Sequence, residues 1–224
     1  MTEYKPLQNI AYDHLREMIY SREMKFDVIY SETRLAGKLS ISRTPMRDAL
    51  NRLSRERYID ILPNRGFQLH KPSRDEIWEA YHIRMMIEGY CGNLLAQGHQ
   101  TEEAQAALSV MQQCLDDQTG LLDNPSGVDL RKFWLKDQEF HFALLRFLNI
   151  SAFNTQYDSF MHIFMPQNLN DAYVLGRNHS TITEHREIID ALRSGDTAKT
   201  RSVIENHLNA TLRLSLKSIE QENP

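Results

Sequence analysis

The chain has 224 residues, of which 41% are hydrophobic and 25% are charged, a composition that is typical of folded globular proteins and excludes collagen-like or largely disordered chains. The formal net charge of -4, taken as one number, argues against a nucleic-acid partner. No run approaches the roughly 18 to 20 apolar residues that span a bilayer, and no signal-peptide core follows Met1, so the sequence predicts a soluble, cytoplasmic protein with no membrane partner.

Charge is distributed unevenly along the chain. Residues 1–72 carry 13 basic and 9 acidic residues, a net of +4, whereas residues 73–224 carry 13 and 21, a net of -8. Within the first part, residues 34–71 hold nine basic residues against three acidic ones, a local net of +6. The contrast, together with Pro72 between two patterned segments, predicts one domain at 1–72 and a second at 73–224.

The first part has the pattern of three helices followed by a hairpin. Apolar residues recur at helical spacing, serine N-caps precede two of the helices, and two β-like runs flank a turn that ends in glycine. The predicted elements are a helix over 6–22, a short helix from Ser31 to about Leu39, a further helix from Ser42, and strands over 58–62 and 67–70. This order is that of a winged helix-turn-helix.

The second part is helical in period throughout, so we predict a mainly α protein whose C-terminal domain is an all-α bundle. The predicted helices cover residues 74–98, 101–117, 128–148, 151–165, 177–194 and 196–220. Cys91 and Cys114 lie inside such helices without a partner motif, which indicates reduced and partly buried thiols.

The helix that begins after Ser42 has two different faces. One is apolar, and the other carries Arg43, Arg47 and Asn51 at positions i, i+4 and i+8. Arginine can donate two hydrogen bonds to O6 and N7 of guanine in the major groove of DNA. The apolar face therefore suits packing, while the second face suits base recognition.

The run from Leu35 to Leu53, with Ser42-Arg43-Thr44-Pro45-Met46-Arg47 at its centre, resembles the helix-turn-helix of GntR-family bacterial transcription regulators. The segment Pro63-Asn64-Arg65-Gly66-Phe67 is similar to the wing of that family. The chain departs from the family pattern at three sites, since Ser40 stands where glycine is common, Arg57-Tyr58 replaces glycine-leucine and Phe26-Asp27 replaces proline-glycine. These departures alter turns rather than base-reading groups.

The resemblance implies a set of DNA contacts and a mode of binding. It adds Arg34 on the preceding helix and Arg65 and Gly66 at the wing to the stripe of Arg43, Arg47 and Asn51. Phosphate contacts are assigned to the start of the helix that follows Ser42, which is the recognition helix of the motif. The expected DNA-binding residues are Arg34, Arg43, Thr44, Arg47, Asn51, Arg65 and Gly66. A regulator of this kind binds a partly palindromic double-stranded operator as a homodimer. The sequence leaves open whether three further arginines contact DNA or only lie on the solvated surface, namely Arg52, Arg55 and Arg57.

Asp137 and His141 are four residues apart on a predicted helix, and His185 and His207 lie on two later helices. A carboxylate and three imidazoles suit Zn, Ni, Mn or Fe, but sequence spacing alone does not show that the four groups converge. This part of the chain resembles the helical FCD-type effector-binding domain of the FadR subfamily. The resemblance implies a divalent metal at these four residues, because metal-binding members use an aspartate and three histidines in these motif contexts.

The resemblance also implies a small-molecule effector near the metal. Arg84 matches an arginine of the subfamily and would neutralise an organic acid, while an alternative is an intrahelical ion pair with Glu88. Asn149 and Asn206 are expected as polar neighbours of the effector. Gln167 and Asn168 are further candidates from their position alone.

The function that these patterns predict is a ligand-responsive DNA-binding transcription regulator, a repressor and not an enzyme. The main alternative is a metal-dependent hydrolase or lyase that uses the aspartate and histidines to activate water. No P-loop, dinucleotide fingerprint, nucleophile elbow or metalloprotease motif accompanies them. A purely architectural DNA-binding protein would not need the histidines. The sequence does not identify the metal, the effector, the operator or the direction of the response.

Overall fold

The computed structural model describes residues 5–21, 23–124, 127–164 and 172–220. The chain divides into two compact units, residues 1–71 and residues 72–224, which are described separately below. Within the described ranges, no helix combines the length and the apolar character that a membrane crossing requires.

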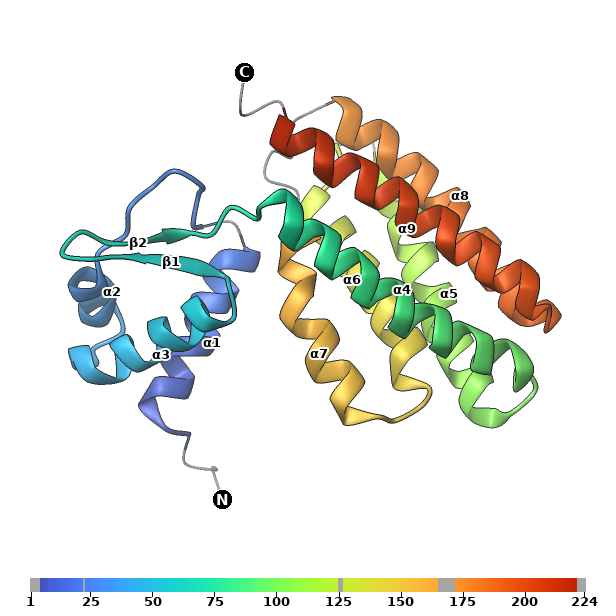
Figure 1. Cartoon of the computed structure of the whole chain (residues 1–224), viewed down its shortest axis with the longest axis horizontal. Helices are drawn as coiled ribbons and strands as arrows, with labels where there is room; N and C mark the ends of the chain where they lie inside the picture. Colours follow the sequence, from blue (N-terminus) through green and yellow to red (C-terminus); the bar gives the residue numbers. More distant parts are fainter. Residues whose placement is uncertain (1–4, 22, 125–126, 165–171, 221–224) are drawn as a thin grey trace. The chain divides into compact units, whose positions relative to one another are not determined.

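The N-terminal unit is a winged helix-turn-helix, as the sequence predicts (Figure 1). Its elements are α1 (Leu7–Tyr20), α2 (Glu32–Lys38), α3 (Arg43–Arg55), β1 (Ile59–Leu62) and β2 (Gly66–Leu69). The strands pair antiparallel, with Ile59 opposite Leu69 and Leu62 opposite Gly66. The apolar stripes of the helices meet in a core that includes Leu15, Met46 and Leu53. This packing leaves the arginine face of α3 exposed.

The wing is held against the chain before α2 by a close backbone contact. The amide of Tyr30 donates to the carbonyl of Phe67 at 2.7 Å, and the amide of Phe67 donates back at 3.0 Å. Gly66 has a φ of 124°, and a Cβ atom there would lie 2.1 Å from the carbonyl oxygen of Tyr30. Glycine is therefore required at this position by the backbone approach itself.

Each of the three departures from the family pattern includes a residue with left-handed backbone. Asp27, Ser40 and Arg57 have φ values of 62°, 54° and 60°. Ser40 follows the end of α2, where the amide of Ile41 donates to Ala36 and the amide of Ser40 donates to Gly37. Such a helix ending favours glycine, because a Cβ atom in this conformation costs roughly 1 to 2 kcal/mol.

We therefore expect Ser40→Gly to stabilise the N-terminal unit by about 0.5 to 1 kcal/mol, since glycine relieves this strain but gains freedom in the unfolded chain. Urea unfolding of the full chain, followed by circular dichroism, measures the change. Ser42→Gly is the matched control, because Ser42 has a φ of -72° and the same gain is not available there. An unchanged or lower unfolding free energy for Ser40→Gly would contradict the strain argument.

The C-terminal unit is the predicted all-α bundle. Its elements are α4 (Arg74–Gln97), α5 (Glu102–Leu122), α6 (Leu130–Arg146), α7 (Ser151–Met161), a 3-10 turn (His162–Phe164), α8 (Ala172–Ser194) and α9 (Thr197–Glu220). Ser73 and Glu76 form a capping box at the start of α4, and the side chain of Asp196 caps α9 by accepting from Lys199. Helices α4 and α9 run side by side (Figure 1).

Three helix boundaries differ from the sequence prediction by more than two residues, and one of them is the end of α7 at Met161 instead of 165. Helix α5 continues to Leu122 rather than ending near 117, because Leu121 and Leu122 pack against the core of the bundle. Helix α8 begins at Ala172, five residues earlier than expected. Cys91 and Cys114 form no disulfide, as predicted, but they are fully rather than partly buried, and burial raises the pKa of each thiol to about 12.

Candidate functional site

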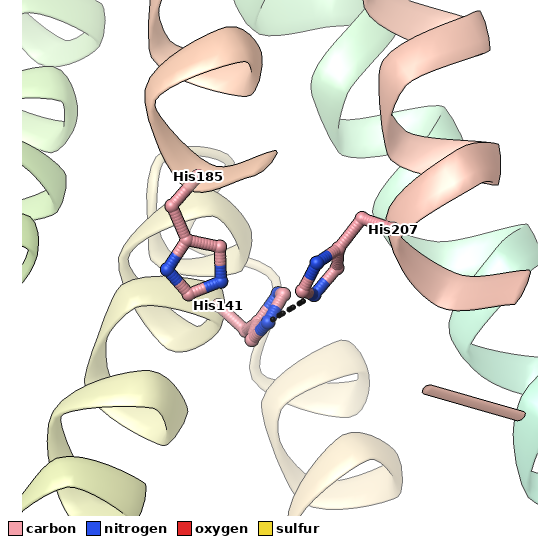
Figure 2. A group of neighbouring side chains, drawn as sticks. All are labelled: His141, His185 and His207. Carbon is pink, nitrogen blue, oxygen red and sulfur yellow. Dashed lines mark hydrogen bonds between the residues drawn. The ribbon is translucent and has the colours of Figure 1, made fainter. Parts of the chain in front are cut away.

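Three buried histidines from three different helices of the C-terminal unit meet at one point (Figure 2). His141 lies on α6, His185 on α8 and His207 on α9, and one ring nitrogen of each lies within 4.8 Å of the others. Asp137, one turn before His141, brings Oδ1 to 3.5 Å from Nε2 of His185 and Oδ2 to 4.0 Å from Nε2 of His141. The structure thus brings together the four residues that the sequence singled out.

Each imidazole is oriented by an oxygen acceptor on its outer nitrogen. Nδ1 of His141 contacts the Glu88 carboxylate at 2.8 Å, and Nδ1 of His207 contacts the Glu184 carboxylate at 2.7 Å. Nδ1 of His185 contacts Oε1 of Gln118 at 3.0 Å. Because these oxygens accept, a proton on Nδ1 satisfies each contact and allows Nε2 to offer its lone pair to a metal. Outer-sphere acceptors of this kind accompany histidines that bind metals.

The Nε2 atoms therefore form a convergent set of donors to a cation. Those of His141 and His207 lie 3.1 Å apart, within hydrogen-bonding distance of each other (Figure 2). Burial, together with the neighbouring histidines, holds the pKa of His185 and of His207 well below the ordinary value, which keeps both imidazoles neutral. Nε2 of His185 is buried and has no hydrogen bond among the described residues. The residues present fit a divalent metal with nitrogen and oxygen ligands.

Glu88 connects this cluster to helix α4 and to Arg84. Its carboxylate accepts hydrogen bonds from Nε of Arg84 at 2.7 Å and from the hydroxyl of Tyr157 at 2.5 Å. Burial alone would raise the pKa of Glu88, but the charge of Arg84 and the contact with His141 hold it far below its ordinary value. The sequence alternative for Arg84, an ion pair with Glu88, is thus present in the structure.

Arg84 also lines a cavity that reaches the histidine cluster. The cavity has a volume of ≈ 70 Å³, and Asp137 and His207 form part of its wall. Nη2 of Arg84 and Oε1 of Gln138 are buried and make no hydrogen bond within the described structure, and both residues line the cavity. Arg177, Asn178 and Thr181 of α8 add polar groups to the same wall. One end of the Arg84 fork thus binds Glu88, while the other is available to a ligand.

The structure leaves Asn149 and Asn206, the expected polar neighbours of the effector, on exposed positions. Asn149 is exposed just after α6 with a φ of 51°, a conformation that asparagine tolerates, so its backbone accounts for its presence. Asn206 is exposed on α9, because a residue adjacent to the inward-facing His207 points about 100° away from it. Neither residue lines the cavity at Arg84. Gln167 and Asn168 lie outside the described residues.

Sequence reasoning missed Gln118 and Arg177 and left Glu184 unplaced. Arg177 donates to both carboxylate oxygens of Glu184, at 2.9 and 2.7 Å, and thereby fixes the acceptor of His207. Gln118 is fully buried on the apolar face of α5, in register with Met111 and Leu115. A glutamine that continues an apolar stripe was the signal that could have identified it.

We expect Gln118→Met to weaken divalent-metal binding by roughly 10- to 100-fold, because it removes the acceptor that orients His185 while keeping the side-chain volume. Titration of the metal-free full chain with Zn²⁺ measures this affinity. Gln113→Met is the matched control on the exposed side of the same helix. Equal affinities for the two variants would mean that the hydrogen bond to Gln118 does not tune the site.

Of the seven expected DNA-binding residues, which lie on α2, α3 and the wing, six are exposed and Gly66 is partly exposed. A groove of ≈ 470 Å³ is lined by Arg43, Arg47 and Asn51 of α3 and by Arg65 and Gly66 of the wing. Arg34 and Thr44 are exposed on α2 and in the first turn of α3. The geometry therefore presents one arginine-lined surface on this unit.

The structure distinguishes Arg52 from the other two arginines that the sequence left open. Its Nε donates to the Glu56 carboxylate at 2.9 Å, and its guanidinium carbon lies 3.8 Å from the centre of the Tyr12 ring. Tyr12 in turn donates its hydroxyl to Glu56 at 2.5 Å. Arg52 thus fastens α3 to α1 rather than extending toward a partner. Arg55 and Arg57 are exposed.

Comparison with known proteins agrees with both units. Residues 7–69 match the family of bacterial regulatory proteins called the gntR family, and residues 79–210 match the FCD domain. The chain is 25% identical over 206 residues to an uncharacterized HTH-type transcriptional regulator in an unstable DNA locus of Streptomyces ambofaciens, with 89% of this chain and 80% of the relative covered. It is 25% identical over 201 residues to the HTH-type transcriptional repressor RspR of Escherichia coli strain K12, with 86% and 81% covered.

Two solved structures have the same fold. Escherichia coli McbR/YncC superposes with a TM-score of 0.78 at 17% identity, covering 96% of this chain and 100% of that one. A putative transcriptional regulator GntR from Rhodococcus sp. RHA1 superposes with a TM-score of 0.76 at 24% identity, covering 94% and 97%.

A winged helix-turn-helix followed by an FCD domain defines a class of DNA-binding transcription regulators. The chain belongs to the GntR family of bacterial regulatory proteins, and the resemblance found in the sequence is confirmed. The family and the relatives are transcription regulators and not enzymes, so the alternative of a metal-dependent hydrolase or lyase is wrong.

Proposed function

We propose that the protein is a repressor of the FadR subfamily that binds a partly palindromic operator in the cytoplasm as a homodimer. In this proposal residues 1–72 read the DNA, and residues 73–224 bind a divalent metal and a small organic acid and hold the dimer together. The observation that carries the sensing role is the convergence of three buried imidazole Nε2 atoms beside Asp137. The naming of the Escherichia coli relative RspR as a repressor supports the direction of control.

The metal would be held by Asp137, His141, His185 and His207. When bound, it supplies a Lewis-acidic centre with positions open to a carboxylate or hydroxyl oxygen. The residues of the cavity wall support an anionic ligand, because Arg84 presents Nη2 there without a hydrogen bond among the described residues, and Arg177, which is paired with Glu184, adds a second guanidinium to the wall. A cavity of ≈ 70 Å³ suits a small acid.

Effector control would be a shift between populations of the dimer. An acid that binds one arrangement of the two winged units more tightly than another favours that arrangement, by no more than its differential affinity. Operator half-sites lie at a fixed spacing, so only some arrangements place both copies of α3 in successive major grooves. The segment at Lys71, Pro72 and Ser73 joins the two units and must transmit the change.

The direct test of DNA binding uses the full chain and the DNA upstream of its own gene. Fluorescence anisotropy at a fixed salt concentration compares this fragment with a scrambled duplex of equal length and composition, because affinities at different salt are not comparable. A repressor of this kind prefers the upstream fragment by about 1000-fold or more. Equal affinity for the two duplexes would count against an operator in that fragment and against sequence-specific readout.

A further inference from the structure

Glu32 is an acidic residue in the arginine-lined groove of the N-terminal unit. It occupies the first turn of α2, directly after the N-cap Ser31, and it lines the groove between α3 and the wing. Its side chain is only 20% exposed, whereas those of Arg43 and Arg47 are 63% and 61% exposed. A carboxylate in a groove that is expected to face DNA is repelled by phosphates, so solvation alone does not explain why an acidic residue occupies this position.

The carboxylate lies between the two arginines that are expected to read bases. Oε1 of Glu32 is 3.6 Å from Nε of Arg43 and 3.6 Å from Nε of Arg47. At this distance the contacts are electrostatic rather than hydrogen bonds, and the same oxygen has no hydrogen-bond partner among the described residues. One negative charge therefore attracts two positive charges that, at i and i+4 on one face of α3, would otherwise repel each other.

The contact leaves the base-reading ends of both arginines available. Nε is on the stem side of the guanidinium, and the two terminal Nη groups can still donate together to O6 and N7 of guanine. A flexible arginine loses side-chain freedom when it is fixed on a base, so an arginine that is already restrained loses less on binding. A restrained arginine is also less free to swing to a neighbouring phosphate, where it would bind without regard to sequence.

We infer that Glu32 is a positioning residue that sets the sequence specificity of this regulator. It holds Arg43 and Arg47 side by side for two bases of each half-site, and its charge weakens contacts to phosphates at sites of the wrong sequence. The inference rests on the proposed DNA-reading role of α3. A competing explanation is that Glu32 only stabilises the start of α2 through the helix dipole, which would affect folding but not base preference.

The test uses the full chain and a duplex that the wild-type protein selects from a random-sequence pool. The measured quantity is the affinity for this duplex divided by the affinity for a scrambled one, at one salt concentration. We expect Glu32→Gln to lower this ratio by about tenfold, through weaker selected binding and equal or stronger scrambled binding. Glu32→Asp should lower it too, because the charge stays but the carboxylate is withdrawn by one methylene.

Controls separate positioning from charge and from folding. Asp48→Asn removes one acidic group from the exposed side of α3 and should keep the wild-type ratio. The inference is overturned if Glu32→Gln keeps the ratio within about twofold. It is also overturned if Glu32→Asp behaves as wild type while Glu32→Gln and Asp48→Asn each change the affinities for the selected and the scrambled duplex by the same factor. The ratio is compared only for variants whose thermal unfolding shows a folded chain, and Glu32→Asp serves if Glu32→Gln does not fold.

Failure of the proposed function has a different signature. If Arg47→Ala keeps the wild-type ratio, α3 does not read bases, and the role of Glu32 is overturned with it. If Arg47→Ala loses the ratio and Glu32→Gln keeps it, only the role of Glu32 is overturned. A second selection with Glu32→Gln, expected to give relaxed preference at the guanine positions, reports a change that helix stabilisation alone would not produce.

Discussion

His185→Ala is expected to abolish tight binding of a divalent metal by the C-terminal unit. The variant removes one of three convergent Nε2 donors, a larger loss than the roughly 10- to 100-fold that removal of an outer hydrogen bond costs. Zn²⁺ titration of the metal-free full chain measures the change. The proposed organic-acid effector should also bind more weakly, because the metal supplies part of its site.

The matched control is His179→Ala, an exposed histidine on the same helix. The ring of His185 stacks on the ring of Phe140 with 3.8 Å between the two ring centroids, so alanine leaves a void there. His185→Gln is therefore a second variant, which keeps most of the side-chain volume. Both variants at position 185 should lose metal, while His179→Ala retains it. Wild-type Zn²⁺ affinity in a folded His185→Gln variant would exclude His185 from the ligands.

Arg47→Ala is expected to abolish operator-specific binding. A bidentate arginine–guanine pair contributes about 1 to 3 kcal/mol of discrimination, and the proposed homodimer would carry the residue twice, so the expected loss is on the order of 2 to 6 kcal/mol. Binding of the wild type and the variant to a wild-type-selected duplex, measured by anisotropy at moderate salt, gives this difference.

Arg47→Lys is the control that separates charge from readout. Lysine keeps the positive charge but not the planar fork, so binding to scrambled DNA should be near wild type while binding to the selected duplex falls. Arg52→Ala offers a further comparison, because Arg52 is tied to Glu56 and Tyr12 and should change stability more than base preference. Unchanged affinity of Arg47→Ala for the selected duplex would remove Arg47 from the base-reading set.

The order of the elements was predictable because its signals are local. The serine cap at Ser31, the proline and glycine turn at the wing, and the cap at Asp196 each act within a few residues, and the structure has them in place. The turns at Asp27, Ser40 and Arg57 were recognised as departures, but their left-handed backbone is visible only in the structure. The backbone strain at a turn depends on the direction in which the next helix or strand packs, and a local sequence pattern does not specify that direction.

The candidate metal site was predictable only in part. Residue types and the i, i+4 spacing suggested Asp137 and His141, but the convergence of His185 and His207 was implied by resemblance rather than by spacing. Gln118 and Arg177 were missed because each acts on a partner from another helix or two turns away. Asn149 and Asn206 were predicted from polarity near a motif, which does not fix the direction of a side chain, and both side chains are exposed.

The most direct test of the metal-dependent account is elemental analysis combined with native mass of the purified full-length protein. We predict one divalent metal ion per chain and the mass of a homodimer, with the metal lost in His185→Gln and retained in His179→Ala. Metal-free protein obtained from cells grown with ample Zn, Ni, Mn and Fe, and taking up none of these ions on titration, would contradict the account.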